Sequence, residues 1–171
     1  MPVHSFVCAL PPAAAVAALV LTFAAPASAQ DRYHGISYTS APAEGTSVRW
    51  GTATAVLDFP LDEVTALIHD YASFSDYLPH FQTSRVLARR GNRARVYIEV
   101  TALNESVTLW AQMNVRSREV EGARVITGEM SDGNLDHFRV RWELSAVDEG
   151  RTRVRFRLLA DPDLPIPSSL I

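Results

Sequence analysis

Residues 136–160 read DHFRVRWELSAVDEGRTRVRFRLLA, and this stretch decides the fold. On both sides of the loop at 148–150, apolar and polar side chains alternate, which is typical of β-strands with one buried face. A three-residue loop that ends in glycine is a common hairpin connection. Because an odd loop pairs even-numbered residues with each other, all the apolar side chains fall on one face. The predicted pairs are Val140 with Leu158, Trp142 with Phe156, Leu144 with Val154, and on the other face Glu143 with Arg155.

A second hairpin gives the same result independently. The two-residue turn Asn104-Glu105 also brings two alternating apolar sets onto one face. It predicts the pairs Val96 with Met113, Ile98 with Ala111, and Val100 with Leu109. Two turns that agree in this way favour an antiparallel meander of about six strands after residue 81.

Upstream, residues 47–58 are predicted to form a first strand, and residues 60–72 a short helix. Pro60 suits the first helical position, and the acidic pair Asp62-Glu63 suits the first turn. Residues 71–81 then contain four aromatic side chains, which form either the mouth of a ligand pocket or a plug on the core. One short helix cannot cover so wide a sheet, so the sheet curls around a cavity or another element docks on it.

Four stretches carry a family resemblance: VLDFPLDEV at 56–64, DYASFSDYLPHF at 70–81, GRTRV at 150–154 and DPDLPIP at 161–167. Over residues 47–171 the chain resembles the START-like superfamily, which includes polyketide cyclases and coenzyme Q-binding proteins. The resemblance implies an α+β helix-grip (Bet v 1-like) fold, with a curved antiparallel sheet and a short helix after the first strand. It also implies a sheet that grips a long C-terminal helix, with a cavity between them for lipids, quinones or other apolar ligands.

The C-terminal helix of this family is expected to be missing, because the sequence stops at Ile171, just after Ser168 and Ser169, either of which suits a helix N-cap. The sequence is then either a truncated reading frame or fragment, or a variant whose cavity another element closes. An uncovered apolar sheet face would bind a hydrophobic dye, dimerise through the sheet, or precipitate. A partner or second copy that covers the open sheet is therefore expected.

The resemblance implies which inward side chains line the cavity. The expected ligand-binding residues are Tyr77, Phe81, Val96, Ile98, Leu109, Met113, Phe138, Val140, Trp142, Phe156 and Leu158. Met113 is the most adaptable of them, because a thioether conforms to varied apolar ligands.

The polar residues predict no catalytic, metal or cofactor site. In His69-Asp70 and Asp136-His137 the adjacent side chains point apart, so neither pair is built for acid–base work. Asp132 with the second pair meets no metal-ligand spacing. Phosphate loops, nucleophile elbows and paired metal-binding histidines are also missing from the sequence.

Arginines alternate with the apolar residues of the last two strands, so they are expected on the outer face: Arg139, Arg141, Arg151, Arg153, Arg155 and Arg157. A solvated face that protects the sheet from edge pairing is the favoured interpretation. The alternative is peripheral membrane contact with anionic headgroups through Arg139, Arg141, Arg153, Arg155 and Arg157.

Composition limits the remaining classes. The chain has 171 residues, 47% of them hydrophobic, which suits one globular domain. A net charge of −3 argues against nucleic acid as the main partner. All 16 basic side chains are arginines, which excludes a catalytic lysine, and Cys8 is the one cysteine.

The N-terminus predicts export. An apolar run at 13–25, Pro26 and the small residues 27–29 match a signal peptide over 1–29, with an uncleaved membrane anchor as the alternative. Residues 30–46 are expected to be a flexible leader. The sequence therefore predicts a non-enzymatic carrier of a hydrophobic small molecule in the cell envelope, periplasmic or secreted. The alternatives are a cyclase-type enzyme that uses the same cavity and an interaction module with an open sheet face.

Overall fold

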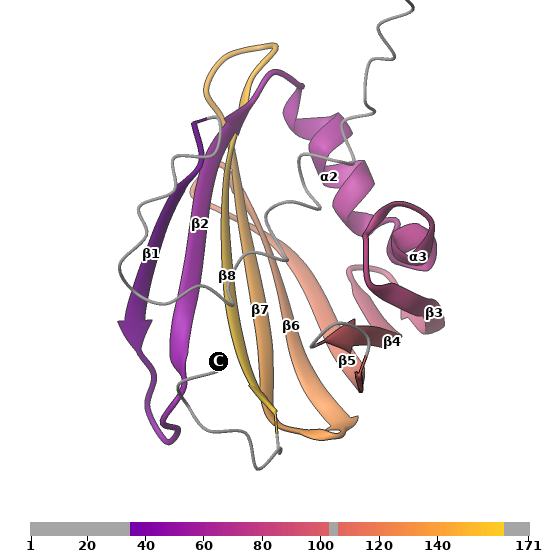
Figure 1. Ribbon diagram of the computed structural model, residues 1–171. Coiled ribbons are helices and arrows are strands. Elements are labelled where there is room, and N and C mark those ends of the chain that lie inside the picture. Colours follow the sequence, from indigo (N-terminus) through magenta and orange to yellow (C-terminus); the bar gives the residue numbers. More distant parts are fainter. Residues whose placement is uncertain (1–34, 103–105, 163–171) are drawn as a thin grey trace, which may run out of the picture.

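The computed structural model describes residues 35–102 and 106–162, which form one antiparallel sheet with short helical segments on its inner side (Figure 1). The strands are β1 (Ser37–Pro42), β2 (Arg49–Leu57), β3 (Phe81–Arg90), β4 (Arg93–Ala102), β5 (Val107–Val120), β6 (Ala123–Gly133), β7 (Leu135–Ala146) and β8 (Thr152–Pro162). The helical segments are α2 (Leu61–His69), the 3-10 turn η1 (Tyr71–Ser73) and α3 (Phe74–Tyr77). The sheet order is β1-β2-β8-β7-β6-β5-β4-β3.

The meander and its register are confirmed. From β3 to β8, every strand pairs with the next strand along the chain. Trp142 lies opposite Phe156, and Val100 opposite Leu109, as the two loop lengths predict. The strand predicted over residues 47–58 is β2, and it pairs with the last strand, β8. The meander and β2 therefore belong to one continuous sheet.

The leader prediction was wrong for residues 37–42, which form the edge strand β1 against β2. Nearly all of β1 is exposed, because only β2 lies beside it. An edge strand that buries neither face needs no alternation of apolar side chains, so it leaves no period in the sequence.

The helix predicted over 60–72 is shorter than expected. Pro60 is the N-cap, and α2 ends at His69 because Asp70 adopts a non-helical backbone (φ −82°, ψ 59°). The chain resumes as η1 and α3, and this break turns Tyr71, 6% exposed, into the core. The aromatic segment is therefore two short helical turns rather than a loop.

The core consists of two clusters of buried side chains. The first cluster joins α2 to β2, β6, β7 and β8: Ala53, Ala55, Val64, Ile68, Ile126, Trp142, Leu144, Val154 and Phe156. The second joins η1 to β4, β5 and the start of β7: Tyr71, Ala94, Val96, Ile98, Ala111, Met113 and Leu135. Val115 and Val140 pack against both clusters.

The sheet curls around the space between these clusters. Register shifts in β3–β4, β5–β6 and β7–β8 mark bulges, which bend strands and increase their twist. In Figure 1 the sheet curves from β1 and β2 round to β3, and α2 and α3 lie on its inner side. The predicted α+β helix-grip architecture is confirmed, while residues 163–171, where the C-terminal helix would start, lie outside the described residues. Among the helices described, none has the length and apolar character to cross a membrane.

Candidate ligand-binding cavity

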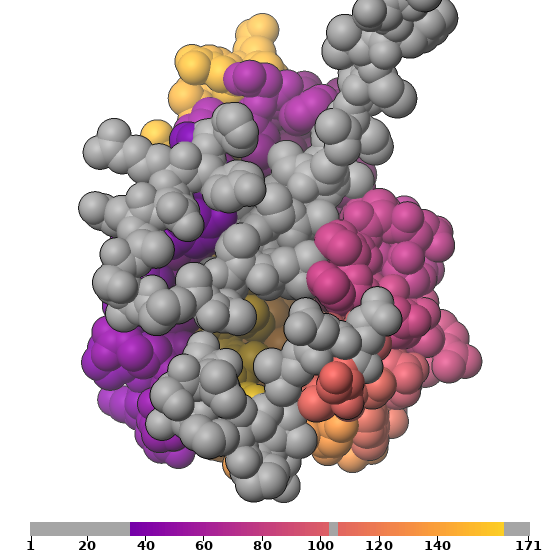
Figure 2. All heavy atoms as spheres, viewed as in Figure 1, coloured from indigo at the N-terminus to yellow at the C-terminus, as the bar shows by residue number. Residues whose placement is uncertain are grey.

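A partly open cavity of about 310 Å³ lies between the curved sheet and the helical segments. Its walls come from α2, η1, α3 and strands β3 to β8. In Figure 2 the atoms of β7 and β8 are recessed behind a rim that includes α3 and β5. Small-molecule pockets in proteins usually measure about 300–1,000 Å³, so this cavity has the size of a ligand site at the lower end of that range.

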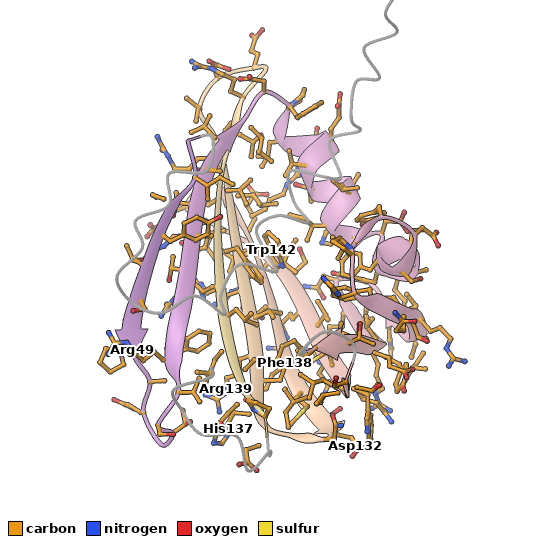
Figure 3. All side chains as sticks on the ribbon, in the orientation of Figure 1. Arg49, Asp132, His137, Phe138, Arg139 and Trp142 are labelled. Atoms are coloured by element: carbon orange, nitrogen blue, oxygen red, sulfur yellow. The ribbon has the colours of Figure 1, made fainter. Side chains whose placement is uncertain are left out.

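The structure brings all eleven expected ligand-binding residues to this cavity. Tyr77 comes from α3 and Phe81 from the start of β3. The strands supply Val96, Ile98, Leu109, Met113, Phe138, Val140, Trp142, Phe156 and Leu158. Phe138 and Trp142 lie on β7 within the curve of the sheet (Figure 3). Their contact with a ligand remains a prediction.

Sequence reasoning missed other lining residues. The helical segments add Leu67, Ile68, Tyr71, Phe74 and Leu78. Ala111 could have been found from strand parity, because it shares a face of β5 with the predicted residues Leu109 and Met113. Leu135 could not, because the bulge between Leu135 and His137 reverses the alternation of β7 at that point.

Edge-to-face aromatic contacts hold the helical wall of the cavity together. The ring of Phe74 lies 5.8 Å from that of Tyr71, and 6.0 Å from those of Tyr77 and Phe81. The Tyr77 hydroxyl donates to the Leu67 carbonyl over 3.2 Å. The aromatic segment therefore serves as core and as cavity wall at once, which combines the two predicted roles.

Arg89 braces this wall from the edge strand. Its guanidinium lies 5.5 Å from the centre of the Tyr71 ring and donates to the His69 carbonyl over 3.1 Å. The Ser84 hydroxyl donates to the Tyr71 carbonyl. These contacts fix η1, which has few backbone hydrogen bonds of its own.

The cavity walls are almost entirely apolar. Among the described lining residues, no carboxylate, imidazole, guanidinium or thiol is present. Burial raises the pKa of Tyr71 to about 12, and burial with the neighbouring carboxylates of Asp70 and Asp76 raises the pKa of Tyr77 to about 12. Both hydroxyls therefore stay protonated near neutral pH. The lining also contains one unsatisfied polar group: the buried Oγ1 of Thr101 has no hydrogen-bond partner among the described residues.

The histidine–carboxylate pairs lie outside the cavity lining. The Nε2 atom of His69 is buried without a described partner, and burial with the charges of Arg89 and Arg124 lowers the pKa of His69. Within the described ranges, no three His, Cys, Asp or Glu side chains are grouped so that they could hold a metal ion, and this includes Asp132, Asp136 and His137.

The predicted outer arginines differ in their neighbours. Arg139 approaches Glu129 at 3.4 Å, while Glu143 receives Arg141 at 2.7 Å and Arg155 at 3.7 Å. Arg157 covers the ring of Trp50 at 4.9 Å. Arg153 is exposed, and Arg151 pairs with Asp148 at 2.6 Å. Several of these charges are thus already paired, as expected for a solvated strand surface.

Comparison with known proteins defines the class. The model of the family "polyketide cyclase / dehydrase and lipid transport" matches residues 57–171, and the chain belongs to this family. Membership indicates hydrophobic ligand binding or a polyketide cyclase-type function. No curated protein matches the sequence.

Solved structures show the same fold at low identity. The STAR-related lipid transfer protein of Xanthomonas axonopodis has a TM-score of 0.68 and 18% identity, with 80% of this chain and 82% of that chain covered. The human StAR-related lipid transfer protein 5 has a TM-score of 0.65 and 9% identity, with 80% of this chain and 73% of that chain covered. The Zhui aromatase/cyclase of Streptomyces sp. R1128 has a TM-score of 0.57 and 16% identity, with 68% of this chain and 71% of that chain covered. The predicted START-like membership is confirmed, whereas carriage and catalysis are both found among similar folds.

Proposed function

We propose that the protein binds one apolar small molecule in the cavity between its helices and sheet, and carries it without chemical change. The observation that carries the proposal is the lining, which consists almost entirely of aliphatic and aromatic side chains, without a described group that titrates near neutral pH. General acid–base chemistry needs such a group within reach of the substrate. Burial of apolar ligand surface needs only the walls that are present.

The size and polarity of the cavity narrow the ligand class. A volume of about 310 Å³ suits a single apolar chain or a compact ring system. The unpartnered Thr101 hydroxyl would offer the ligand one hydrogen bond. A buried polar group without a partner costs free energy, so a ligand with one matching polar atom would bind more tightly than a pure hydrocarbon.

We place this carrier in the cell envelope, on the strength of the apolar run and small residues that end at Ala29. Intact-mass measurement of the exported protein should then find Gln30 as the first residue. A full-length mass in the cytosol would contradict the envelope role and leave the binding proposal untouched.

The binding proposal is tested by native mass spectrometry of protein purified from its own envelope, which should reveal a bound lipid-like or quinone-like species. A hydrophobic dye supplies the quantitative probe. Ala160→Leu adds side-chain volume at a lining position and should weaken dye binding, whereas Ala66→Leu, on the exposed side of α2, should not. Equal dye binding by both variants would place the apolar site elsewhere.

A cyclase-type function predicts a different result in the same assay. A substrate that leaves the cavity cyclised, lighter by one water, would show catalysis. The carrier proposal requires the ligand to be recovered with unchanged mass after extended incubation. That outcome must hold at protein concentrations that saturate the ligand.

A further inference from the structure

The outer face of the sheet, turned away from the cavity, carries a groove of about 900 Å³ across β3 to β7. Trp50 on β2 lies at one end of it, and Arg90 on β3 at the other. Its lining contains eight arginines and one described carboxylate, Glu129. The arginines are Arg89, Arg90, Arg93, Arg95, Arg116, Arg118, Arg139 and Arg141. Arg89 reaches the inner side, where it contacts Tyr71, so seven of the 16 basic side chains of a chain with net charge −3 gather on the outer side of this hollow.

The strand register arranges some of these charges in a line, which we call the arginine row: Arg90, Arg93, Arg116 and Arg141. Arg90 lies directly opposite Arg93, and Arg93 directly opposite Arg116. Thr127 separates Arg116 from Arg141, and Arg157 continues the line on β8. Neighbouring strands lie about 4.8 Å apart, so the charges of the row follow one another at one strand spacing, except across Thr127, where the gap is two strand spacings.

Without a bound anion, this arrangement of charges lowers the stability of the folded protein. Like charges directly opposite each other in an antiparallel pair are destabilising. Arg90, Arg93 and Arg116 are exposed, and none of them has an ion-pair partner within the described ranges. A solvated face normally alternates the two signs of charge, as Glu143 does with Arg141 and Arg155. Arg90, Arg93 and Arg116 break this rule, and three adjacent unpaired arginines point to a bound anion.

We propose that the arginine row binds a linear chain of phosphate groups, laid along the groove across the strands. The planar guanidinium holds phosphate oxygens through two parallel hydrogen bonds. A phosphate chain carries more negative charges along its length than the row has guanidinium groups, so each arginine of the row can meet a phosphate, and the chain would relieve the repulsion within the row. This inference concerns the outer face and does not depend on the proposed ligand of the cavity.

Two other anionic partners fit the groove less well. An acidic peptide across the sheet face would bring backbone N–H and C=O groups against strands whose own backbone groups are already paired in the ladders. An anionic membrane is flat and does not enter a hollow. Trp50, which would be the apolar anchor, is half-buried and covered by Arg157. A phosphate chain has neither difficulty.

The experiment measures binding of inorganic polyphosphate to the full chain and compares two double variants with the same loss of charge. Arg93→Gln/Arg116→Gln removes the centre of the row, and Arg49→Gln/Arg153→Gln removes two exposed arginines outside the groove lining. The groove variant should lose affinity by about tenfold or more and lower the salt dependence by about two phosphate contacts. The control variant should bind as the unmodified protein does.

Thermal unfolding adds a readout that a general charge effect would not give. Without polyphosphate, Arg93→Gln/Arg116→Gln should raise Tm, because like-charge pairs are removed. With polyphosphate, the Tm of the unmodified protein should rise, and that of the groove variant should rise by less at the same polyphosphate concentration. Equal losses of affinity in both variants would overturn the proposal. So would tighter binding of single-stranded DNA, of polyglutamate or of phosphatidylglycerol vesicles than of polyphosphate.

Discussion

At the scale of single residues, the contact between Trp142 and Phe156 is the most consequential one in the inner face. The two ring centres lie 4.0 Å apart at an angle of 34°, and both side chains are buried. Trp142→Ala should lower the free energy of unfolding by about 3–5 kcal/mol, as for other buried aromatics. Urea titration measures this change, with Trp110→Ala as the control, because Trp110 is only half-buried and stacks on Tyr97. A loss under about 1 kcal/mol for Trp142→Ala would contradict its place in the core.

His80 is a second informative residue, because its backbone has φ 67° although it is not glycine. Its carbonyl accepts the Thr101 N–H over 2.8 Å, which holds this conformation at the start of β3. His80→Val should destabilise the protein by about 1–2 kcal/mol, since a β-branched residue tolerates the left-handed region poorly. His80→Gly should cause no loss, because glycine adopts this region freely. The side chain is exposed, so equal losses in both variants would assign the effect to something other than backbone strain.

His69 makes stability depend on pH. Its pKa is lowered from 6.5, first by burial and then by Arg89 and Arg124. Below about pH 6.5 the unfolded chain therefore binds a proton that the folded protein resists, so stability falls as the pH falls through that value. His69→Phe keeps a ring beside Tyr71 and should reduce this fall, as measured by urea midpoints between pH 5 and 7.5. His137→Phe is the matched control, and it should retain the pH dependence of the unmodified protein.

At the scale of elements, β6 passes close between its neighbours because Gly128 has no side chain. A Cβ atom there would lie 2.8 Å from Val140 Cγ2 and 3.2 Å from Met113 Cε. Gly128→Ala should cost about 1–3 kcal/mol, as expected for overpacking of a core. The combination of Gly128→Ala with Val140→Ala should recover part of that loss in thermal unfolding, because the nearest obstructing methyl group is gone. Additive losses would mean that the strands do not collide.

The same scale shows what the sequence could predict. Loop lengths and two-residue periods determine the register of β4 with β5 and of β7 with β8, because one face of each strand is buried. The cavity residues on those strands follow from parity. The edge strand β1 has no alternation of apolar and polar residues, because most of it is exposed. The inward position of Leu135 cannot be found from the alternation either, because a bulge after it reverses the pattern of β7. The early end of α2 depends on the burial of Tyr71, a tertiary contact that helical spacing cannot reveal.

At the scale of the whole molecule, the sheet separates two kinds of chemistry across a single layer of backbone. On β7 the apolar Val140 lies toward the cavity, while its neighbours Arg139 and Arg141 belong to the outer groove. Val115 and Val140 line both the cavity and the groove, but Arg93 and Arg116 line only the groove and Ala160 lines only the cavity. We therefore expect substitutions at these three positions to act independently. Arg93→Gln/Arg116→Gln should therefore leave dye binding unchanged, and Ala160→Leu should leave polyphosphate binding unchanged. Isothermal titration of both ligands against both variants measures this, and a loss of both activities in one variant would show that the faces are coupled.

The division of the core into two clusters has a consequence for how the molecule opens. Among the described residues, Val115 and Val140 are the apolar contacts common to both clusters. Side chains of both clusters line the cavity. Because so few apolar side chains join the two clusters, we expect the amide hydrogens to exchange in two cooperative groups, one around β4 and β5 and the other around β2 and β8. An apolar guest in the cavity would touch both groups and fuse them into one. Ligand binding would then give a common hydrogen-exchange rate to backbone amides at both ends of the sheet, including amides that the ligand does not contact.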